Sequence, residues 1–364
     1  MRPLNFVLTV AVLMLAACGV RGTLAVLPED SPPTREKTVL VATSRTEAPA
    51  PDFFGDARSY KTNFSKFVIS IPPEREIGEV EYPGQNNVDP AKQFLVSSVT
   101  RFDGKEQFVL GINDAARRLP LEERQGFVFV HGFNTNSAEG IIRATALTED
   151  TGRKGVEVVY SWPSAGSVLK YLDDRESALF ARDSFKETLM AMSESRLRDY
   201  LVVAHSMGTF VAMDTMRELA QQNNTSTLRK VRAIILISAD LDIDVFRKQA
   251  VPVMKQGIPI ILLTTNDDLA LRLSATLRRQ ADRVGDIKTK SELGDLDVIV
   301  FDFTDVQTGD PLKHFKIGSS PEVLNLLRKL NEAGGGAIAP SGSGLVVNID
   351  EETFEAQTDV EVSQ

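Results

Sequence analysis

One serine in the middle of the chain has neighbours that suit a nucleophile. The segment VVAHSMGTF, residues 202–210, places Ser206 after a run of aliphatic residues and two positions before Gly208. A nucleophilic serine on a sharp strand-to-helix turn is normally found in the pattern G-x-S-x-G. Here Ala204 occupies the first glycine position, and alanine is the next smallest residue at a crowded turn. The segment therefore predicts a nucleophile at Ser206, with one imperfect position.

A serine hydroxyl needs a base that takes its proton, and histidine is the usual base. The chain contains three histidines. His205 adjoins the serine and would have to fold back over its own backbone to reach it, so we expect His205 to line the pocket. His131 follows an apolar run and is expected to fix a loop. His314, in the segment GDPLKHF, therefore remains as the candidate base.

A carboxylate should orient the base, and for this kind of turn it follows a strand that lies between the serine and the histidine in the chain. Asp240 and Asp242 follow one apolar run, and Asp267 and Asp268 follow the next. We choose Asp268 as the acid and keep Asp267 and Asp240 as alternatives.

The negative charge that develops during attack on a carbonyl needs backbone N–H groups directed at it. We expect one from Met207, the residue after the serine, and a second from Phe133 or Asn134 in the segment HGFN. The segment YLDDRESA, residues 171–178, is expected to be an ion-paired helix start rather than a metal site. Since no cluster has the spacing of metal ligands, neither a metal nor another cofactor is expected.

The elements that must position these residues alternate along the chain. Short runs rich in β-branched residues predict strands, and they are apolar on both alternating faces, as in a parallel sheet that is covered on both sides. These runs are residues 127–130, 156–162, 200–204, 232–240, 258–267 and 297–304. Helices are expected at residues 176–192, 207–220, 244–255, 269–282 and 321–332. This alternation predicts a doubly wound α/β sheet, mostly parallel.

Three further apolar runs precede this repeat with no long helix between them. They are residues 38–44, 66–72 and 93–102, and we expect them to be antiparallel strands that extend one edge of the sheet. Ser206 would then lie at the carboxyl end of a central strand, where ligands bind in open α/β sheets.

The first 18 residues, MRPLNFVLTVAVLMLAAC, have a basic start, an apolar stretch and small residues before Cys18. This is the pattern of a secretory signal, and its end resembles a bacterial lipobox. We therefore expect residues 1–17 to be removed, and Cys18 to be lipidated and inserted in a bilayer. An ordinary signal peptide is the alternative. Gly19 is not the aspartate that retains such lipoproteins at the inner membrane, so the outer membrane facing the periplasm is expected.

The two ends of the mature chain differ in composition from its middle. Residues 18–37 carry several prolines and scattered charge and are expected to be a tether. Residues 333–364 contain GGGAIAPSGSG followed by an acidic stretch, which predicts a flexible tail. We expect one domain, residues 38–332. The chain of 364 residues has a net charge of −9, which excludes the basic face of a nucleic-acid-binding protein.

Five blocks together resemble a family of bacterial α/β-hydrolases, described as esterase- or lipase-like and largely uncharacterised. The blocks are FVFVHGFNTN, YSWPSAGSVLKYLDDRESA, VVAHSMGTF, SADLDIDVFRKQ and NDDLALRLS, and the resemblance runs from about residue 38 to 332. It implies an α/β-hydrolase fold. The family's aspartate block falls on Asp268, its histidine before the SSPEV helix falls on His314, and its serine motif has the alanine that this chain has at Ala204.

These residues predict a lipid-anchored serine hydrolase that cleaves an ester, or else a thioester or amide, of a small molecule or a lipid. Two alternatives stay open: a non-catalytic scaffold that binds an envelope partner, and an acyltransferase that uses the same residues. The chain has no long insertion between residues 240 and 258 that could form a large lid, so short or medium acyl groups are expected.

Overall fold

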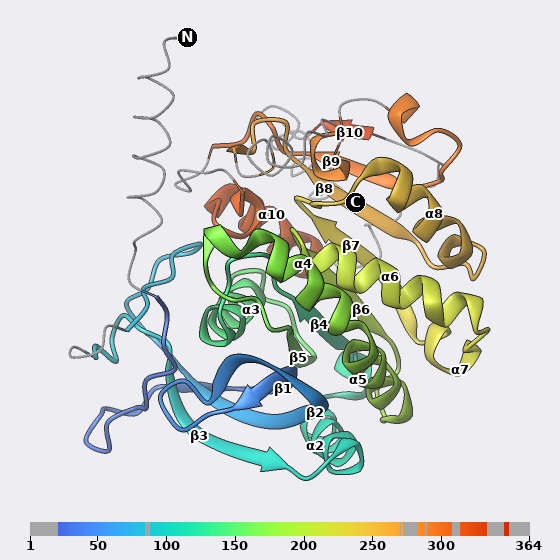
Figure 1. The fold of residues 1–364 in the computed structure, drawn as a ribbon. Coiled ribbons are helices and arrows are strands. Elements are labelled where there is room, and N and C mark those ends of the chain that lie inside the picture. Colours follow the sequence, from blue (N-terminus) through green and yellow to red (C-terminus); the bar gives the residue numbers. More distant parts are fainter. Residues whose placement is uncertain are drawn as a thin grey trace.

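The computed structural model describes residues 21–83, 88–269, 271, 283–287, 290–307, 314–332 and 346–348. Within these residues, ten strands form one sheet in the order β10-β9-β8-β7-β6-β4-β5-β1-β2-β3 (Figure 1). The strands are β1 (Arg35–Glu47), β2 (Phe54–Ile71), β3 (Leu95–Phe102), β4 (Gly126–Val130), β5 (Val156–Ser161), β6 (Tyr200–His205), β7 (Val231–Ile237), β8 (Ile260–Thr264), β9 (Ile299–Asp302) and β10 (Val346–Asn348).

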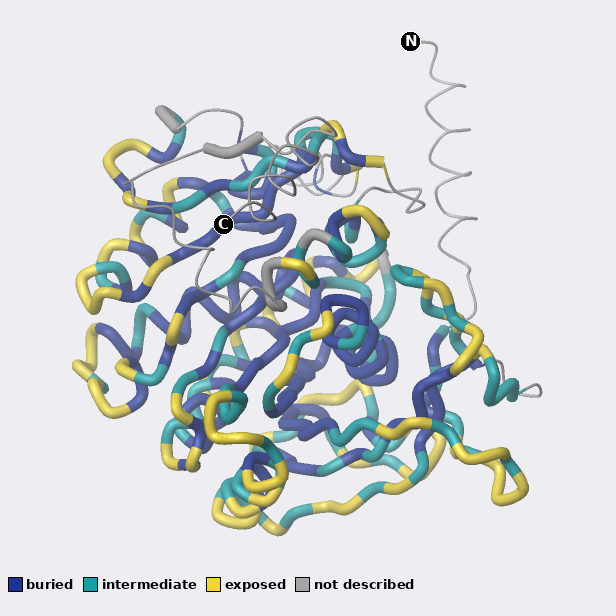
Figure 2. The backbone as a smooth tube through the Cα atoms, turned by 180° about the vertical axis from the view of Figure 1, so that it is seen from behind, coloured by how far each residue is buried: buried dark blue, intermediate teal, exposed yellow. Residues whose placement is uncertain are grey.

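The sheet is parallel from β10 to β1 and antiparallel where β2 and β3 extend it. The expected fold class, a mostly parallel sheet with antiparallel N-terminal strands, is therefore confirmed. The residues of β4, β5 and β8 are all buried, which explains why these strands are apolar on both faces. Figure 2 shows the buried centre and the exposed loops around it.

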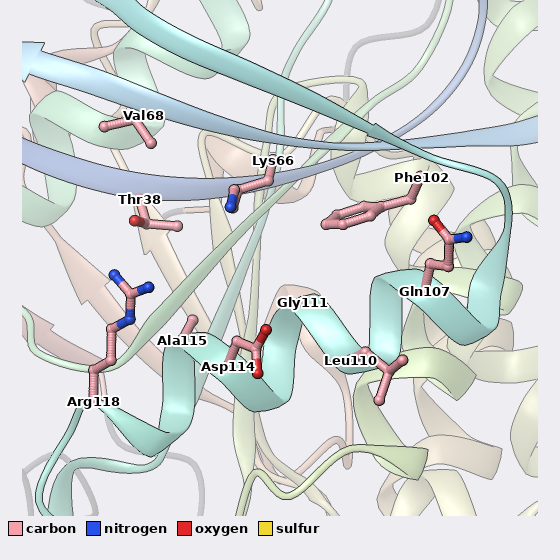
Figure 3. Close-up of a pocket in the computed structure, with 10 residues that line it drawn as sticks. All are labelled: Thr38, Lys66, Val68, Phe102, Gln107, Leu110, Gly111, Asp114, Ala115 and Arg118. Carbon is pink, nitrogen blue, oxygen red and sulfur yellow. The ribbon is translucent and has the colours of Figure 1, made fainter.

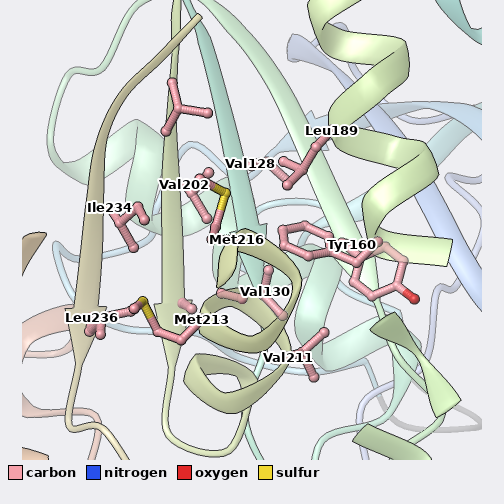
Figure 4. Packing of buried hydrophobic residues seen from close by; sticks show 14 of the residues in the cluster. Val128, Val130, Tyr160, Leu189, Val202, Val211, Met213, Met216, Ile234 and Leu236 are labelled. Atoms are coloured by element: carbon pink, nitrogen blue, oxygen red, sulfur yellow. The ribbon is translucent and has the colours of Figure 1, made fainter. Parts of the chain in front are cut away.

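Helices cover both faces of this sheet. One apolar cluster includes Phe108 of α2, Phe185 of α5, Met213 of α6 and Phe246 of α8, and a second on the opposite face includes Ile141 of α3. Figure 4 shows the side chains of α6 packed against those of β4, β6 and β7. The helices are α2 (Lys105–Arg117), α3 (Ser137–Asp150), α4 (Tyr171–Phe180), α5 (Arg182–Glu194), α6 (Gly208–Gln221), α7 (Thr225–Leu228), α8 (Ile243–Met254) and α10 (Pro321–Glu332). Single 3-10 turns are η1 (Leu121–Glu123), η2 (Val168–Lys170), η3 (Val284–Asp286), η4 (Lys290–Leu293) and η5 (Lys316–Gly318).

Two expected helices differ from the structure. The helix expected at 176–192 is two helices, α4 and α5, which meet at Ala181, and α4 begins earlier, at Tyr171. The helix expected at 269–282 lies almost entirely outside the described residues. The runs expected at 38–44, 66–72 and 93–102, by contrast, overlap β1, β2 and β3, and these strands pair antiparallel in the order β1-β2-β3.

The expected tether and tail also differ. Residues 21–27 are packed on the domain: Leu24 is buried in the same apolar cluster as Phe94, and the Leu27 N–H donates to the Val96 carbonyl at 2.9 Å. The expectation of a tether over 18–37 is therefore wrong for this stretch, because its apolar side chains find partners among distant strands. In the expected tail, β10 pairs with β9. Among the residues that the structure describes, no helix combines the length and apolar character needed to cross a membrane.

Candidate active site

Ser206 lies on the turn between β6 and α6 with a left-handed backbone, φ 51°. A residue other than glycine in this conformation carries about 1 to 3 kcal/mol of strain, which the surroundings must hold in place. Its N–H donates to the Ile237 carbonyl at 2.9 Å. A Cβ at Gly208 would lie 2.3 Å from the His131 carbonyl oxygen, so α6 can approach β4 this closely because it begins with glycine. The turn thus has the strained geometry of a nucleophile elbow.

The structure brings Ser206, His314 and Asp268 together. Ser206 Oγ and His314 Nε2 are 2.7 Å apart, and His314 Nδ1 and Asp268 Oδ2 are also 2.7 Å apart. The Leu271 N–H donates to the other carboxylate oxygen of Asp268 at 2.9 Å. The Asp268 side chain is 1% exposed and that of His314 is 20% exposed. A buried acid therefore holds a partly exposed imidazole against a serine hydroxyl.

The alternative acids have other partners. Asp267 accepts a hydrogen bond from the Lys316 ammonium at 3.0 Å, and Asp240 accepts one from the Tyr171 hydroxyl at 2.6 Å. Asp242 caps the N-terminus of α8. The arrangement thus favours Asp268 over these carboxylates as the partner of His314.

The two other histidines are buried, and both contact the site. The His205 ring donates from Nε2 to the His314 carbonyl at 3.1 Å, and burial followed by the nearby His314 lowers the pKa of His205 well below 6.5. The His131 ring stacks on Trp162 with the centroids 5.2 Å apart, and burial followed by the charge of Arg45 lowers the pKa of His131 to about 3. Both rings are therefore neutral near pH 7.

His131 contacts the carbonyl of Gly132 with Nδ1 at 2.9 Å, in line with the expected loop-fixing role. His205 does more than line a pocket, because it binds the backbone of His314. Trp162 is fully buried, and its indole N–H donates to the His131 carbonyl at 2.6 Å, so it belongs to the core beneath the site.

The loop after β4 passes beside the serine. A Cβ at Gly132 would lie 2.8 Å from Ser206 Cβ, and the next residue, Phe133, packs its ring on Tyr171 at 5.1 Å between centroids. Asn134 has φ 53°, and its backbone amide hydrogen-bonds to the buried Asp174 carboxylate. Phe133 and Asn134 were the two candidates for the second N–H donor to the oxyanion. Because the Asn134 N–H already has a partner, the geometry favours Phe133. Met207 directly follows the serine in the chain and is the N-cap residue of α6.

Asp174 was expected in an ion-paired helix start, but it is fully buried beneath the site loops. It accepts hydrogen bonds from the Ser164 hydroxyl and from the Ala165 N–H, the latter at 2.7 Å. Burial raises the pKa of Asp174, and these hydrogen bonds oppose that rise. The carboxylate therefore ties the loop after β5 to the loop after β4.

A fully buried arginine joins the same two loops, and sequence reasoning did not identify it. Arg45 donates from Nη2 to the carbonyls of Thr135 and Ser164, each at 3.0 Å, and from Nε to Ser161 Oγ at 3.1 Å. Burial lowers its pKa to about 10, so it stays charged near neutrality. The available signal was a charged residue at the end of the apolar run of β1.

A separate hollow of about 440 Å³ lies between β1–β3 and α2 (Figure 3). Its polar lining includes Lys66, Gln107, Asp114 and Arg118. Its lining contains none of the residues that surround Ser206. Among the described residues, no group of three or more His, Cys, Asp or Glu side chains is placed to hold a metal ion.

We compared the chain with solved structures, with curated proteins and with protein families. The fold is similar to that of fungal esterases from Rhizomucor miehei, with a TM-score of 0.35 and 9% identity over 88% of this chain and 86% of that chain. It is also similar to an inhibited esterase B from Lactobacillus rhamnosis, with a TM-score of 0.37 and 11% identity over 92% of this chain and 96% of that chain. Among curated proteins, no sequence matches this chain.

The family described as "Alpha/beta hydrolase of unknown function (DUF900)" matches residues 114–330. This stretch includes β4 to β9, the serine turn, Asp268 and His314, and it covers more than half of the chain. It agrees with the resemblance seen in the sequence blocks. The protein therefore belongs to this family of α/β-hydrolases.

Proposed function

We propose that the protein is a serine hydrolase that cleaves an ester through an acyl-enzyme on Ser206. The proposal is supported above all by the continuous chain of hydrogen bonds from Asp268 through His314 to Ser206, in which both links measure 2.7 Å. Nucleophile, base and orienting acid in this order are the parts that acyl transfer needs.

In the first half of the reaction, His314 Nε2 takes the proton of Ser206 Oγ as that oxygen attacks the carbonyl carbon of the ester. Asp268 holds the proton of His314 on Nδ1, so that Nε2 is free to accept, and stabilises the imidazolium that forms. The N–H groups of Met207 and Phe133 bind the oxyanion of the tetrahedral intermediate. The intermediate then expels the alcohol, which takes the proton from His314.

In the second half, His314 takes a proton from water, and the hydroxide attacks the acyl carbon. The second tetrahedral intermediate releases the carboxylic acid as His314 returns the proton to Ser206 Oγ. We expect the activity to rise with pH as His314 loses its proton, because only the neutral imidazole can act as the base.

A fluorophosphonate probe tests this proposal, because it phosphonylates a serine only when the base and the oxyanion site are assembled. We expect labelling of wild-type protein at Ser206 and none of a Ser206→Ala variant that remains folded. Absence of labelling in folded wild type would support a non-catalytic scaffold. Addition of an alcohol acceptor to an ester assay distinguishes hydrolysis from acyl transfer by the product formed.

The acyl preference can be measured with p-nitrophenyl esters of increasing chain length. Since no large insertion follows β7, we expect the highest kcat/KM with short or medium acyl groups. A clear optimum at long chains would contradict this expectation.

We also propose that Cys18 is lipidated and anchors the protein in the bacterial envelope, at the outer membrane facing the periplasm. The support is the signal-like segment that ends in Leu15-Ala16-Ala17-Cys18. A Cys18→Ser variant should accumulate as unprocessed precursor and should lose acyl labelling. Normal processing of that variant, together with unlipidated wild type, would contradict the anchor.

A further inference from the structure

The segment that follows the proposed anchor is bound to the loop beside the active serine. The Arg21 guanidinium donates to Asn134 Oδ1 at 3.1 Å, to the Asn134 carbonyl at 3.2 Å and to Glu139 Oε2 at 2.8 Å. The Gly22 N–H donates to Glu139 Oε1 at 3.1 Å, and the Asn136 side chain donates to the Gly22 carbonyl at 2.9 Å. Residues 21 and 22 are thus fixed next to Phe133.

This contact limits how far a lipid on Cys18 can lie from the site. Cys18 precedes Arg21 by three residues, and three extended residues span at most about 11 Å. A bilayer that holds the lipid must therefore approach Arg21 at the carboxyl edge of the sheet, where the loops around Ser206 lie. A long flexible tether would have left the orientation of the domain open, whereas this short connection does not.

Exposed apolar side chains lie around the same edge. Leu169 is 76% exposed and Leu172 is 74% exposed, on the η2–α4 segment. This segment follows Gly166, where an added Cβ would lie 2.8 Å from Arg21 Nη2. Tyr171, between the two leucines, packs on Phe133. The leucines are therefore close both to the anchored segment and to the site loops, and burial of such side chains in the interface of a bilayer is favourable.

We propose that the carboxyl edge of the sheet faces the membrane, and that the substrate is an ester carried by an amphiphile resident in that membrane. The inference rests on the proposed hydrolase and on the lipid anchor. Arg21 sets the orientation by joining the anchored end to the Phe133 loop, and Leu169 and Leu172 enter the interface. Because the chain has a net charge of −9, apolar contact rather than attraction to anionic headgroups supplies the docking.

An orientation measurement tests the inference without any need for activity. Lipidation of Cys18 uses the one cysteine of the chain, so a Leu172→Cys variant of the full lipidated protein can be labelled at a single site. In vesicles of zwitterionic phospholipid with brominated acyl chains, we expect the fluorescence of a label at 172 to be quenched. A label in a Leu110→Cys variant, on the exposed surface of α2, should not be quenched. Equal signals at the two positions would overturn the inference.

An activity measurement tests the substrate class. The same butyryl ester is offered in two forms: free in water, and attached through its alcohol to a long-chain amphiphile in zwitterionic vesicles. The double variant Leu169→Asp, Leu172→Asp should hydrolyse the vesicle-bound ester at least about fivefold more slowly than wild type and keep the rate on the free ester within about twofold. The matched control Leu110→Asp, Leu121→Asp, also at exposed leucines, should keep both rates.

A longer connection between the anchor and the domain provides a third test. A flexible linker of about 20 Gly and Ser residues between Gly19 and Val20 spans about 25 Å on average and should release the domain from its fixed orientation. We expect a slower rate on the vesicle-bound ester and an unchanged rate on the free ester. If both the linker and the double variant keep the full rate on vesicles, the membrane-facing site is wrong and the hydrolase stands. If wild type hydrolyses neither ester and Ser206 is not labelled, the proposed function itself fails.

Discussion

The two sides of Ser206 are each held by a buried cation, and the cations differ in kind. On the side of Phe133, the planar guanidinium of Arg45 binds three carbonyl groups, a hydroxyl and the Asp56 carboxylate. The side chain of Asp56 is 68% exposed. This fork joins β1 to the loops after β4 and β5, and the loop after β4 carries the Phe133 N–H that we propose for the oxyanion site.

On the side of His314, the cation is the ammonium of Lys316. It donates to the carbonyls of Phe303 and Thr304 at 3.2 and 2.8 Å and to Asp267 at 3.0 Å. Lys316 is two residues from His314, and its partner Asp267 is 27% exposed.

The comparison indicates that the two buried cations, Arg45 and Lys316, have different roles. Arg45 connects three strands and fixes backbone groups that stay unchanged during the proposed reaction. Lys316 holds a short segment whose histidine takes and returns a proton in the proposed reaction. We therefore expect loss of the Arg45 contacts to lower mainly the free energy of unfolding. Loss of the Lys316 contacts should lower mainly kcat. The following variants test this difference.

The largest effect is expected from removal of the reacting groups themselves. Ser206→Ala and His314→Ala should each lower kcat by about a millionfold, because a nucleophile and its base act as one unit. The measurement is kcat on one activated ester, with circular dichroism as the control for folding. Rates near wild type in the folded His314→Ala protein would overturn the proposed mechanism.

The next effect concerns the acid. Asp268→Asn should leave an activity a few tens of times above that of Ser206→Ala, because loss of the orienting acid costs less than loss of the nucleophile. Asp267→Asn and Asp240→Asn are the matched controls and should lose much less. A nearly unaffected Asp268→Asn protein beside an inactive Asp267→Asn protein would move the acid to Asp267.

The contributions of Arg45 and Lys316 can be compared directly. Arg45→Met leaves the buried carbonyls of Thr135 and Ser164 without this donor and should lower the free energy of unfolding by about 3 kcal/mol. Lys316→Met should cost less stability, about 2 kcal/mol, because water reaches Asp267, but it should lower kcat more in the protein that remains folded. Urea unfolding and the ester assay measure both. A larger drop in kcat for Arg45→Met than for Lys316→Met would contradict the roles that we assign to the two residues.

The last effect, about 1.4 kcal/mol of unfolding free energy per pH unit, is on the pH dependence of stability. Burial lowers the pKa of His131 from 6.5 to about 3, so between these values the unfolded chain binds more protons than the folded one. Stability is therefore full above about pH 6.5 and falls on acidification, by about 1.4 kcal/mol per pH unit from this histidine. Urea unfolding near pH 7 and near pH 5 should show a shallower loss for His131→Asn. Identical slopes in the two proteins would contradict the buried, neutral ring.

Much of the fold follows from local patterns in the sequence. The apolar runs predict β4 to β9 because a strand buried on both faces has to be apolar throughout. The turn around Ser206 can be recognised because only small neighbours fit it. His314 can be predicted as the base because the chain has few histidines. The other two are less suitable, since His205 adjoins the serine and His131 directly follows an apolar run.

What the sequence by itself determined is therefore the order of strands and helices, the serine turn and a short choice of partners for Ser206. Only the tertiary structure decided what holds these residues in place. The contacts of Arg45 with Thr135, of His205 with the His314 carbonyl and of Arg21 with Asn134 join residues about 90 or more positions apart. No local periodicity specifies such pairs, because they depend on which loops the sheet order brings to one edge.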